Sequence, residues 1–174
     1  MKAIVYKGKH ALRKMKIMKN PSEVNSRHQK LEVLYKEQPE KAWITDTAEI
    51  IGENLEDPFR TTVTMNTELK VPFRVGVHKA VGGDHDFPNP GDMLCATLAS
   101  CMESTARMIA NRYNIQLKRT RVKVSAYVDV RGTLRIDIKT PVEFQAMHID
   151  FDIQSDDLDS KGLKMFVLSL ITAR

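Results

Sequence analysis

The order of its residue patterns predicts an α+β protein with antiparallel strands around a buried central helix. Apolar and polar residues alternate on both sides of a helical stretch, as they do in half-buried strands. The helical stretch carries no charge from Met93 to Met102, and a helix that is apolar nearly all round is a buried one. Because strands and helices do not alternate regularly, the βαβ units of a parallel sheet are not expected.

Length and composition predict one soluble globular domain. The chain has 174 residues, of which 42% are hydrophobic and 28% charged, enough to build a real core. No apolar run approaches the ~18 residues of a membrane span, and no secretory signal follows the N-terminal lysines. The two cysteines are too few for a disulfide scaffold, so we expect a reducing compartment, the cytoplasm.

The net charge of +5 lies in the N-terminal part. Ten basic residues against two glutamates give residues 1–36 a charge of +8, whereas the rest, with 17 basic and 20 acidic residues, has −3. We therefore expect a basic N-terminal extension at 1–57 and a folded domain at 58–174. A basic arm could bind nucleic acid, but a solvated segment is the simpler interpretation, so no nucleic-acid partner is expected. Pro21, Ser22 and Glu23 predict a helix to about Lys36.

The first strands are predicted between Pro58 and Val77, with a turn at 66–68. Pro72 indicates that the second of them is an edge strand or bulged. The preceding segment, Ala42–Ile51, is ambiguous, and its apolar residues could form a strand pair that packs on the core.

The central helix is predicted from Pro90 to about Tyr113, because Asn89 is a good N-cap and proline suits the first helical position. After it we expect a strand at 122–130, a turn at 129–132 and a return strand at 134–138. A third strand with a bulge is predicted at 142–153, and a last helix capped by Ser155, Asp156 and Asp157.

The two cysteines, Cys95 and Cys101, both lie on the central helix. A free cysteine is most often a small core residue. Cys101, however, follows the small residues Ala99 and Ser100, and Glu103 is close to it along the helix. A nucleophilic thiol would need a cation supplied by the strands. Six residues along a helix separate Cα atoms by ~9 Å, too far for a disulfide.

Metal and nucleotide sites are not expected. His78, Asp84, His85 and Asp86 could cluster in one loop, but their spacing matches no metal motif. The glycine pair Gly82–Gly83 is not followed by the residues of a phosphate loop. The sequence therefore predicts no cofactor.

A family resemblance begins in the loop before the central helix. Residues 78–101, HKAVGGDHDFPNPGDMLCATLASC, resemble the osmotically inducible protein C and organic hydroperoxide resistance (OsmC/Ohr) family. The similarity continues through residues 102–110 and the strand at 122–132, and it spans roughly Pro58 to Ile153.

The resemblance implies an OsmC-like fold and an intertwined homodimer with active sites at its interface. It also implies a thiol peroxidase that reduces small organic hydroperoxides in oxidative or osmotic stress defence. Cys101 falls on the position of the peroxidatic cysteine, which becomes a sulfenic acid. An arginine of the early strands steadies the thiolate; Arg60 is nearest to that place and Arg74 second. Cys95 and Glu103 are candidate supporting residues.

The sequence departs from the family pattern in three respects, the first of which is Cys95, an additional thiol that the family's well-defined peroxidases do not need. Gly91 stands where the peroxidases usually carry a glutamate. No cysteine follows Cys101, although the family uses a second one on the C-terminal helix, and we interpret the C-terminus as shortened. An external thiol or dithiol would then have to reduce the sulfenic acid. The alternative is a catalytically inactive dimer that binds a small apolar ligand at its interface.

Overall fold

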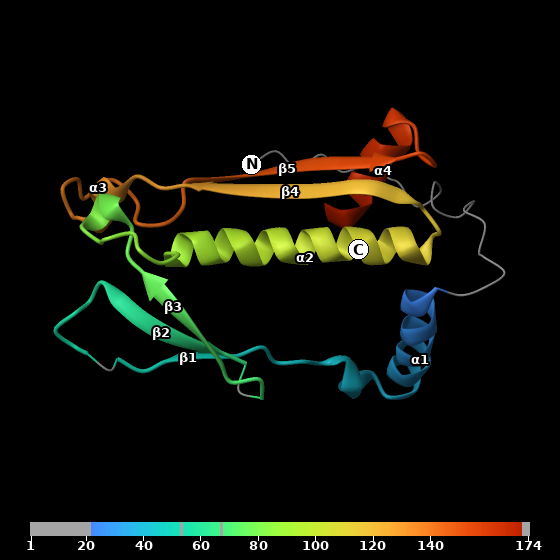
Figure 1. Cartoon of the computed structure of the whole chain (residues 1–174), viewed down its shortest axis with the longest axis horizontal. Helices are drawn as coiled ribbons and strands as arrows, with labels where there is room; N and C mark the ends of the chain where they lie inside the picture. The colour runs from blue at the N-terminus through green and yellow to red at the C-terminus, as the bar shows by residue number, and fades with distance from the viewer. Residues whose placement is uncertain (1–21, 53, 67, 172–174) are drawn as a thin grey trace. The chain divides into compact units, whose positions relative to one another are not determined.

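The computed structural model describes residues 22–52, 54–66 and 68–171 (Figure 1). Helices and strands follow one another as the α+β prediction requires. The elements are α1 (Glu23–Glu37), η2 (Pro39–Ala42), β1 (Ala48–Ile50), β2 (Arg60–Met65), β3 (Val71–Gly76), η3 (Lys79–Val81), α2 (Pro90–Arg112), β4 (Leu117–Tyr127), α3 (Val130–Thr133), β5 (Ala146–Ser155) and α4 (Ser160–Ile171).

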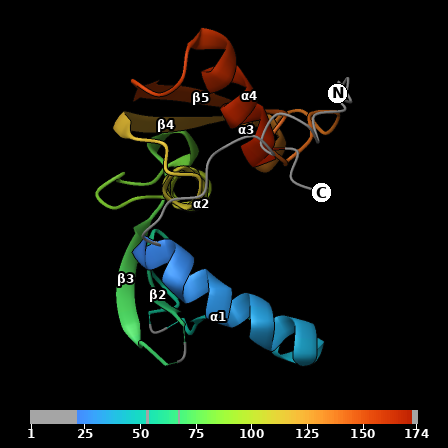
Figure 2. The same cartoon turned by 90° about the vertical axis from the view of Figure 1, so that its right-hand side faces the viewer.

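The described chain divides into two compact units. The helical unit takes in residues 22–41, 100–123 and 150–171, and the sheet unit takes in residues 42–99 and 124–149 except 53 and 67. Helix α2 and the paired strands β4 and β5, which run side by side in Figures 1 and 2, contribute to both units. No helix of the described residues is long and apolar enough to cross a membrane.

The core of the helical unit lies between α2, β5 and α4. Its buried residues are Ala106, Ala110, Ile115, Ile153 and Phe166. Within α2, only Ala106 and Ala110 are buried, whereas Leu94 is 46% and Met108 38% exposed. The predicted burial of the central helix on all sides is therefore not found within one chain.

Helix α1 is attached to the helical unit by polar contacts. It begins after Ser22, whose hydroxyl accepts a hydrogen bond from the Asn25 N–H (3.1 Å), as predicted. None of its residues is buried. The Asn25 amide donates to the carbonyl of Arg112 at the end of α2 (3.3 Å), and Arg112 pairs with Glu32.

The sheet unit contains an antiparallel sheet in the order β1-β2-β3. Strand β3 lies at an edge and carries Pro72, as predicted, because proline has no N–H to donate to a further strand. The inner face is marked by the buried residues Val63 and Val75. Strand β1 confirms a strand in the ambiguous segment, but all its residues are exposed and Trp43 is 87% exposed, so this segment does not pack on the core.

The return strand predicted at 134–138 is wrong. Helix α3 (Val130–Thr133) comes directly before it, and residues 134–138 form turns and a bend. The Asp129 carboxylate caps α3 by accepting from the Arg131 N–H (3.0 Å), and the Ile136 N–H donates back to the Arg131 carbonyl (2.9 Å). Arg135 has a φ of 56°, in the left-handed region that a strand does not use.

Two predicted boundaries also move. Strand β5 begins at Ala146, not at 142, because the Gln145 amide donates to the carbonyls of Pro141 (3.1 Å) and Glu143 (2.7 Å) and holds the preceding residues in a loop. The cap of α4 is Asp159, whose carboxylate accepts from the Gly162 N–H (2.7 Å). The predicted caps at 155–157 lie before that helix.

Candidate functional site

The start of α2 is fixed by two side chains that cap it reciprocally. The Asn89 side-chain oxygen accepts from the N–H groups of Gly91 (2.8 Å) and Asp92 (3.2 Å). The Asp92 carboxylate in turn accepts from the Asn89 N–H (3.1 Å). These bonds satisfy donors that a helix N-terminus leaves free, so the helix that carries both cysteines has a defined first turn.

Removing this cap lowers stability. We expect Asn89→Ala to reduce the free energy of unfolding by about 1 kcal/mol, because it leaves two N–H donors of the first turn without an acceptor. Urea denaturation followed by circular dichroism measures the change. Asn89→Ser keeps an acceptor and serves as the control; equal losses in both variants would contradict the capping role.

The two cysteines differ in exposure. Both are free thiols; Cys95 is half-buried and Cys101 is exposed. They lie in one unbroken helix, so the argument from helix geometry against a bridge between them applies. Cys101 is therefore the thiol that is more accessible to a reagent in solvent.

Leu94, Cys101 and Met108 follow one another at intervals of seven residues along α2 and are all exposed. Seven residues make nearly two turns, so these side chains share one face of the helix. We call this set the α2 stripe. Its two large apolar residues flank the thiol.

Glu103 leaves α2 at about 200° from Cys101, since it follows two residues later. Its carboxylate accepts from the Arg107 Nε (2.8 and 2.9 Å) and from the Thr120 hydroxyl of β4 (2.5 Å). The Arg107 hydrogen bond, followed by that of Thr120, lowers the pKa of Glu103 below its usual range. Glu103 thus ties α2 to β4, and its role toward the thiol stays a prediction.

This lowered pKa makes stability depend on pH. Because the folded-state pKa of Glu103 lies below its unfolded value, its contribution is present at neutral pH and is lost as pH falls through the folded-state pKa. We expect Glu103→Gln to be less stable than the unmodified protein at neutral pH and to approach it in acid. Urea titrations at both pH values test this. Glu143→Gln, at an exposed glutamate, is the control; a deficit that stays constant in acid would contradict the prediction.

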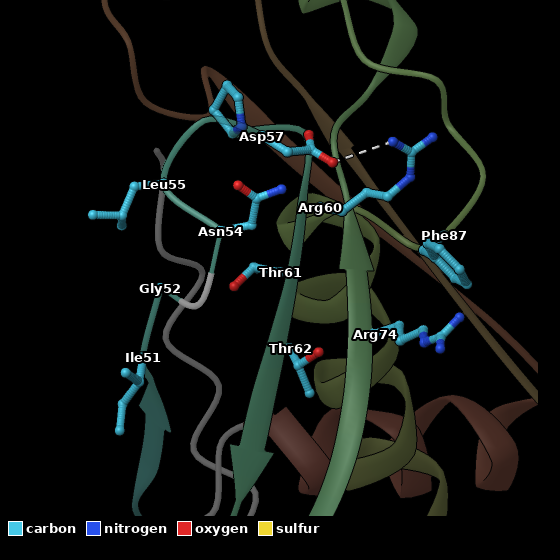
Figure 3. Close-up of a pocket in the computed structure, with 11 residues that line it drawn as sticks. Ile51, Gly52, Asn54, Leu55, Asp57, Arg60, Thr61, Thr62, Arg74 and Phe87 are labelled. Carbon is cyan, nitrogen blue, oxygen red and sulfur yellow. Dashed lines mark hydrogen bonds and ion pairs between the residues drawn. The ribbon is translucent and has the colours of Figure 1, made fainter.

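Arg60 lies in a cluster with three carboxylates. Its Nε donates to Asp86 (2.8 Å), one terminal nitrogen contacts Asp57 (3.4 Å) and the other pairs with Asp84. Figure 3 shows the contact with Asp57. The hydrogen bond from Arg60 lowers the pKa of Asp86, and the same bond is the main cause that raises the pKa of Arg60. Sequence reasoning found Arg60 but not its partners.

Gly76 allows the loop that carries Asp84 and Asp86 to lie close to Arg60. It lies opposite Arg60 in the β2–β3 register, and its N–H donates to the Pro88 carbonyl (3.0 Å). A Cβ at this position would stand 2.9 Å from the Phe87 carbonyl oxygen, so only glycine allows the loop to approach β3 this closely. The loop then sets Asp84 and Asp86 beside Arg60.

Arg74 has a different environment. It pairs with Thr62 across the sheet, and its guanidinium carbon lies 5.5 Å from the centre of the Phe87 ring, within the range of a cation–π contact. Within the described ranges, no carboxylate forms an ion pair with Arg74. Its charge is therefore not neutralised by the part of the chain that the structure describes.

Arg60 and Arg74 both line one pocket of about 580 Å³. Loop residues before β2, the strands β2 and β3, and Phe87 form its walls. Its lining residues are Ile51, Gly52, Asn54, Leu55, Asp57, Pro58, Arg60, Thr61, Thr62, Arg74 and Phe87. The two predicted arginines therefore line the same pocket in the sheet unit. Cys95 also belongs to the sheet unit but does not line this pocket. Cys101 and Glu103 belong to the helical unit.

The histidines of the same loop have local contacts. The rings of His78 and His85 lie 4.7 Å apart and perpendicular, and the Nδ1 of His78 accepts from the Ala80 N–H (3.0 Å). Among the described residues, no group of three or more histidine, cysteine, aspartate or glutamate side chains is arranged to hold a metal ion.

Comparison with known proteins identifies a family. A model of the OsmC-like protein family matches residues 83–170. No curated protein matches the sequence.

Solved structures are similar in fold. An organic hydroperoxide resistance protein OsmC from Legionella pneumophila is 18% identical, with a TM-score of 0.53 over 73% of this chain and 82% of its own. An organic hydroperoxide resistance protein from Elizabethkingia anophelis is 15% identical, with a TM-score of 0.55 over 75% and 84%. An OsmC-like protein from Mycoplasma pneumoniae is 13% identical, with a TM-score of 0.56 over 73% and 80%.

Proposed function

The chain belongs to the OsmC-like protein family, and on this premise we propose that it is a thiol-dependent peroxidase that reduces small organic hydroperoxides with Cys101 as nucleophile. The observation that carries the proposal is the exposure of Cys101 on α2, within the part of the chain that the family model matches. Cys95 is half-buried on the same helix and is the less accessible thiol. The activity would serve oxidative or osmotic stress defence.

The proposed reaction begins with the thiolate form of Cys101. Its sulfur attacks the outer oxygen of the hydroperoxide, the O–O bond breaks, and the alkoxide leaves and takes a proton from solvent to become an alcohol. The sulfur retains the hydroxyl group as a sulfenic acid. An external thiol then forms a mixed disulfide with the sulfur and releases water. A second thiol then attacks the sulfur of the first, so that a disulfide forms between these two and Cys101 leaves as the free thiol.

The external reductant is part of the proposal because Cys95 is too far along the helix to resolve the sulfenic acid in the same subunit. A thiol or dithiol of the cytoplasm, the proposed location, would serve. Arg60 is proposed to steady the thiolate, with Arg74 second. The three carboxylates on Arg60 oppose that role, because their negative charges offset the positive charge that would steady the thiolate.

A homodimer is proposed from the α2 stripe. Leu94 and Met108 are large apolar residues on an exposed helix face, and exposed faces of this kind mark interfaces. A second copy packed there would place Cys101 at the boundary between the two chains. That arrangement agrees with the active sites at the dimer interface that the family resemblance implies.

The dimer makes a direct prediction. Sedimentation velocity should show a dimer, and Met108→Glu should raise its dissociation constant by about tenfold or more, because the new charge would be buried without a partner. Gln29→Glu adds the same charge to an exposed position of α1 and should leave the dimer intact. A monomer in the unmodified protein, or equal behaviour of the two variants, would contradict the proposed interface.

A second function, an inactive dimer that binds a small apolar ligand at its interface, is favoured by the surroundings of Gly91. A Cβ at Gly91 would lie 3.0 Å from the Asn89 side-chain oxygen and 3.4 Å from the Phe144 ring. A side chain such as the glutamate of the family's peroxidases would therefore require the Asn89 oxygen, which caps α2, to shift by a few tenths of an ångström. The test that separates the two functions is trapping of sulfenic acid with a dimedone reagent under cumene hydroperoxide, with Cys95 and Cys101 followed separately by mass spectrometry.

A further inference from the structure

The buried side of α2 lies opposite Cys101. The two buried residues of this helix are Ala106 and Ala110. They follow Glu103 by three and seven residues, so they share one side of the helix with it. Cys101 points about 200° away from Glu103, to the side where it is exposed. Whatever holds the Glu103 side of α2 in place therefore also decides where the thiol faces.

Apolar packing alone does little to fix the rotation of α2 about its axis. Both buried residues are alanines, and among the other described residues of the helix only Ile109 packs against the same core, in a partly buried position. Helices are locked in orientation by ridges of larger side chains that enter the grooves of a neighbour. Two methyl groups make a shallow ridge, so a directional contact is needed to define the orientation of α2.

The hydrogen bond between Glu103 and Thr120 is such a contact. The Glu103 carboxylate accepts from the Thr120 hydroxyl (2.5 Å), and both residues are half-buried. Hydrogen bonds to a charged acceptor are stronger than bonds between neutral groups. The Arg107 Nε, one turn further along α2, donates to the same carboxylate (2.8 and 2.9 Å) and holds the Glu103 side chain in place. The bond therefore connects a fixed point of α2 to a fixed point of β4.

We propose that Thr120 is a positioning residue for Cys101 and that it acts through Glu103. Its hydroxyl holds the Glu103 side of α2 against β4, which keeps the Cys101 thiol on the opposite, exposed side. The inference rests on the proposed function, because the thiol that is positioned is the proposed nucleophile. Glu103 then supports Cys101 through the orientation of the helix, and Thr120 takes no part in the chemical step.

The rate at which N-ethylmaleimide alkylates Cys101 tests the proposal. Mass spectrometry follows Cys101 separately from Cys95. Thr120→Val keeps a β-branched side chain of similar shape but cannot donate to Glu103. We expect it to slow alkylation by about threefold or more, because a turn of α2 in either direction brings the thiol closer to neighbouring side chains. Thr120→Ser keeps the hydroxyl and should react as fast as the unmodified protein.

Three further variants show whether Thr120 acts through Glu103. Thr64→Val makes the same change at a half-buried threonine of β2 and should leave the rate unchanged. Glu103→Ala should slow alkylation by the same factor as Thr120→Val. The double variant Glu103→Ala/Thr120→Val should be no slower than Glu103→Ala, because the hydroxyl has lost its acceptor. A purely structural role of Thr120 in β4 would add its effect in both backgrounds. Circular dichroism verifies that each variant is folded.

The outcomes decide the proposal separately from the peroxidase, because alkylation needs no hydroperoxide. Unchanged or faster alkylation in Thr120→Val, the same slowing in Thr120→Ser or Thr64→Val, or additive effects in the double variant would overturn it. Any of these results together with loss of hydroperoxide reduction in Cys101→Ser would leave the peroxidase in place. The expected slowing in a protein that reduces no hydroperoxide would support the orienting contact and remove only the role of Cys101 as nucleophile.

Discussion

The Cys101→Ser variant is expected to reduce organic hydroperoxide at least about 10³-fold more slowly than the unmodified protein, because a serine hydroxyl does not take the place of a thiolate nucleophile. The measurement is the steady-state consumption of cumene hydroperoxide with a dithiol reductant. Because Cys101 is exposed on α2, its replacement by serine removes no core contact, and the loss is expected without a change in the circular dichroism spectrum.

Cys95→Ser is the matched control, since it removes the other thiol from the same helix. It is expected to keep most of the activity. Full activity of Cys101→Ser together with loss of activity in Cys95→Ser would show that Cys95, and not Cys101, is the nucleophile. Slow and equal oxidation of both thiols would remove the peroxidase proposal and leave the ligand-binding dimer.

The Phe166→Ala variant is expected to lose about 3–5 kcal/mol of unfolding free energy, the cost of a large cavity in a packed core. Phe166 is 2% exposed and belongs to the cluster that α4 shares with α2 and β5. Urea denaturation measures the loss.

Lys164→Ala, at an exposed position of the same helix, is the control and should change stability by less than about 0.5 kcal/mol. A loss at Phe166 no larger than this would mean that α4 does not form the core described above. The pair therefore tests how α4 packs within the helical unit.

Local chemistry made some elements predictable. The start of α2 follows from Asn89 and Pro90, and the edge position of β3 follows from Pro72, because each of these effects acts within a few residues. The segment at 134–138 could not be predicted in this way. Its alternating apolar residues match a strand, but the positive φ of Arg135 and the bonds back to Arg131 come from how the loop closes on α3.

The sequence names candidate site residues but not the contacts that they make. Arg60, Arg74 and Cys101 could be named from the sequence, whereas Asp86 lies 26 residues from Arg60 along the chain. The only indication in the sequence that Asp84 and Asp86 bind the same cation was that they lie two residues apart in one loop. An apolar helix pattern does not tell whether the residues that pack against the helix come from the same chain or from a second copy. In α2, the single chain buries only part of the apolar surface.

The way α1 is attached sets how it responds to ionic strength. It buries no residue, and its contacts with the end of α2 are an amide hydrogen bond and the ion pair of Glu32 with Arg112. Exposed charges are screened over about 10 Å at 0.1 M salt, whereas apolar burial is not weakened by such screening. Salt is therefore expected to weaken the attachment of α1 to the end of α2 before it weakens the core around Phe166.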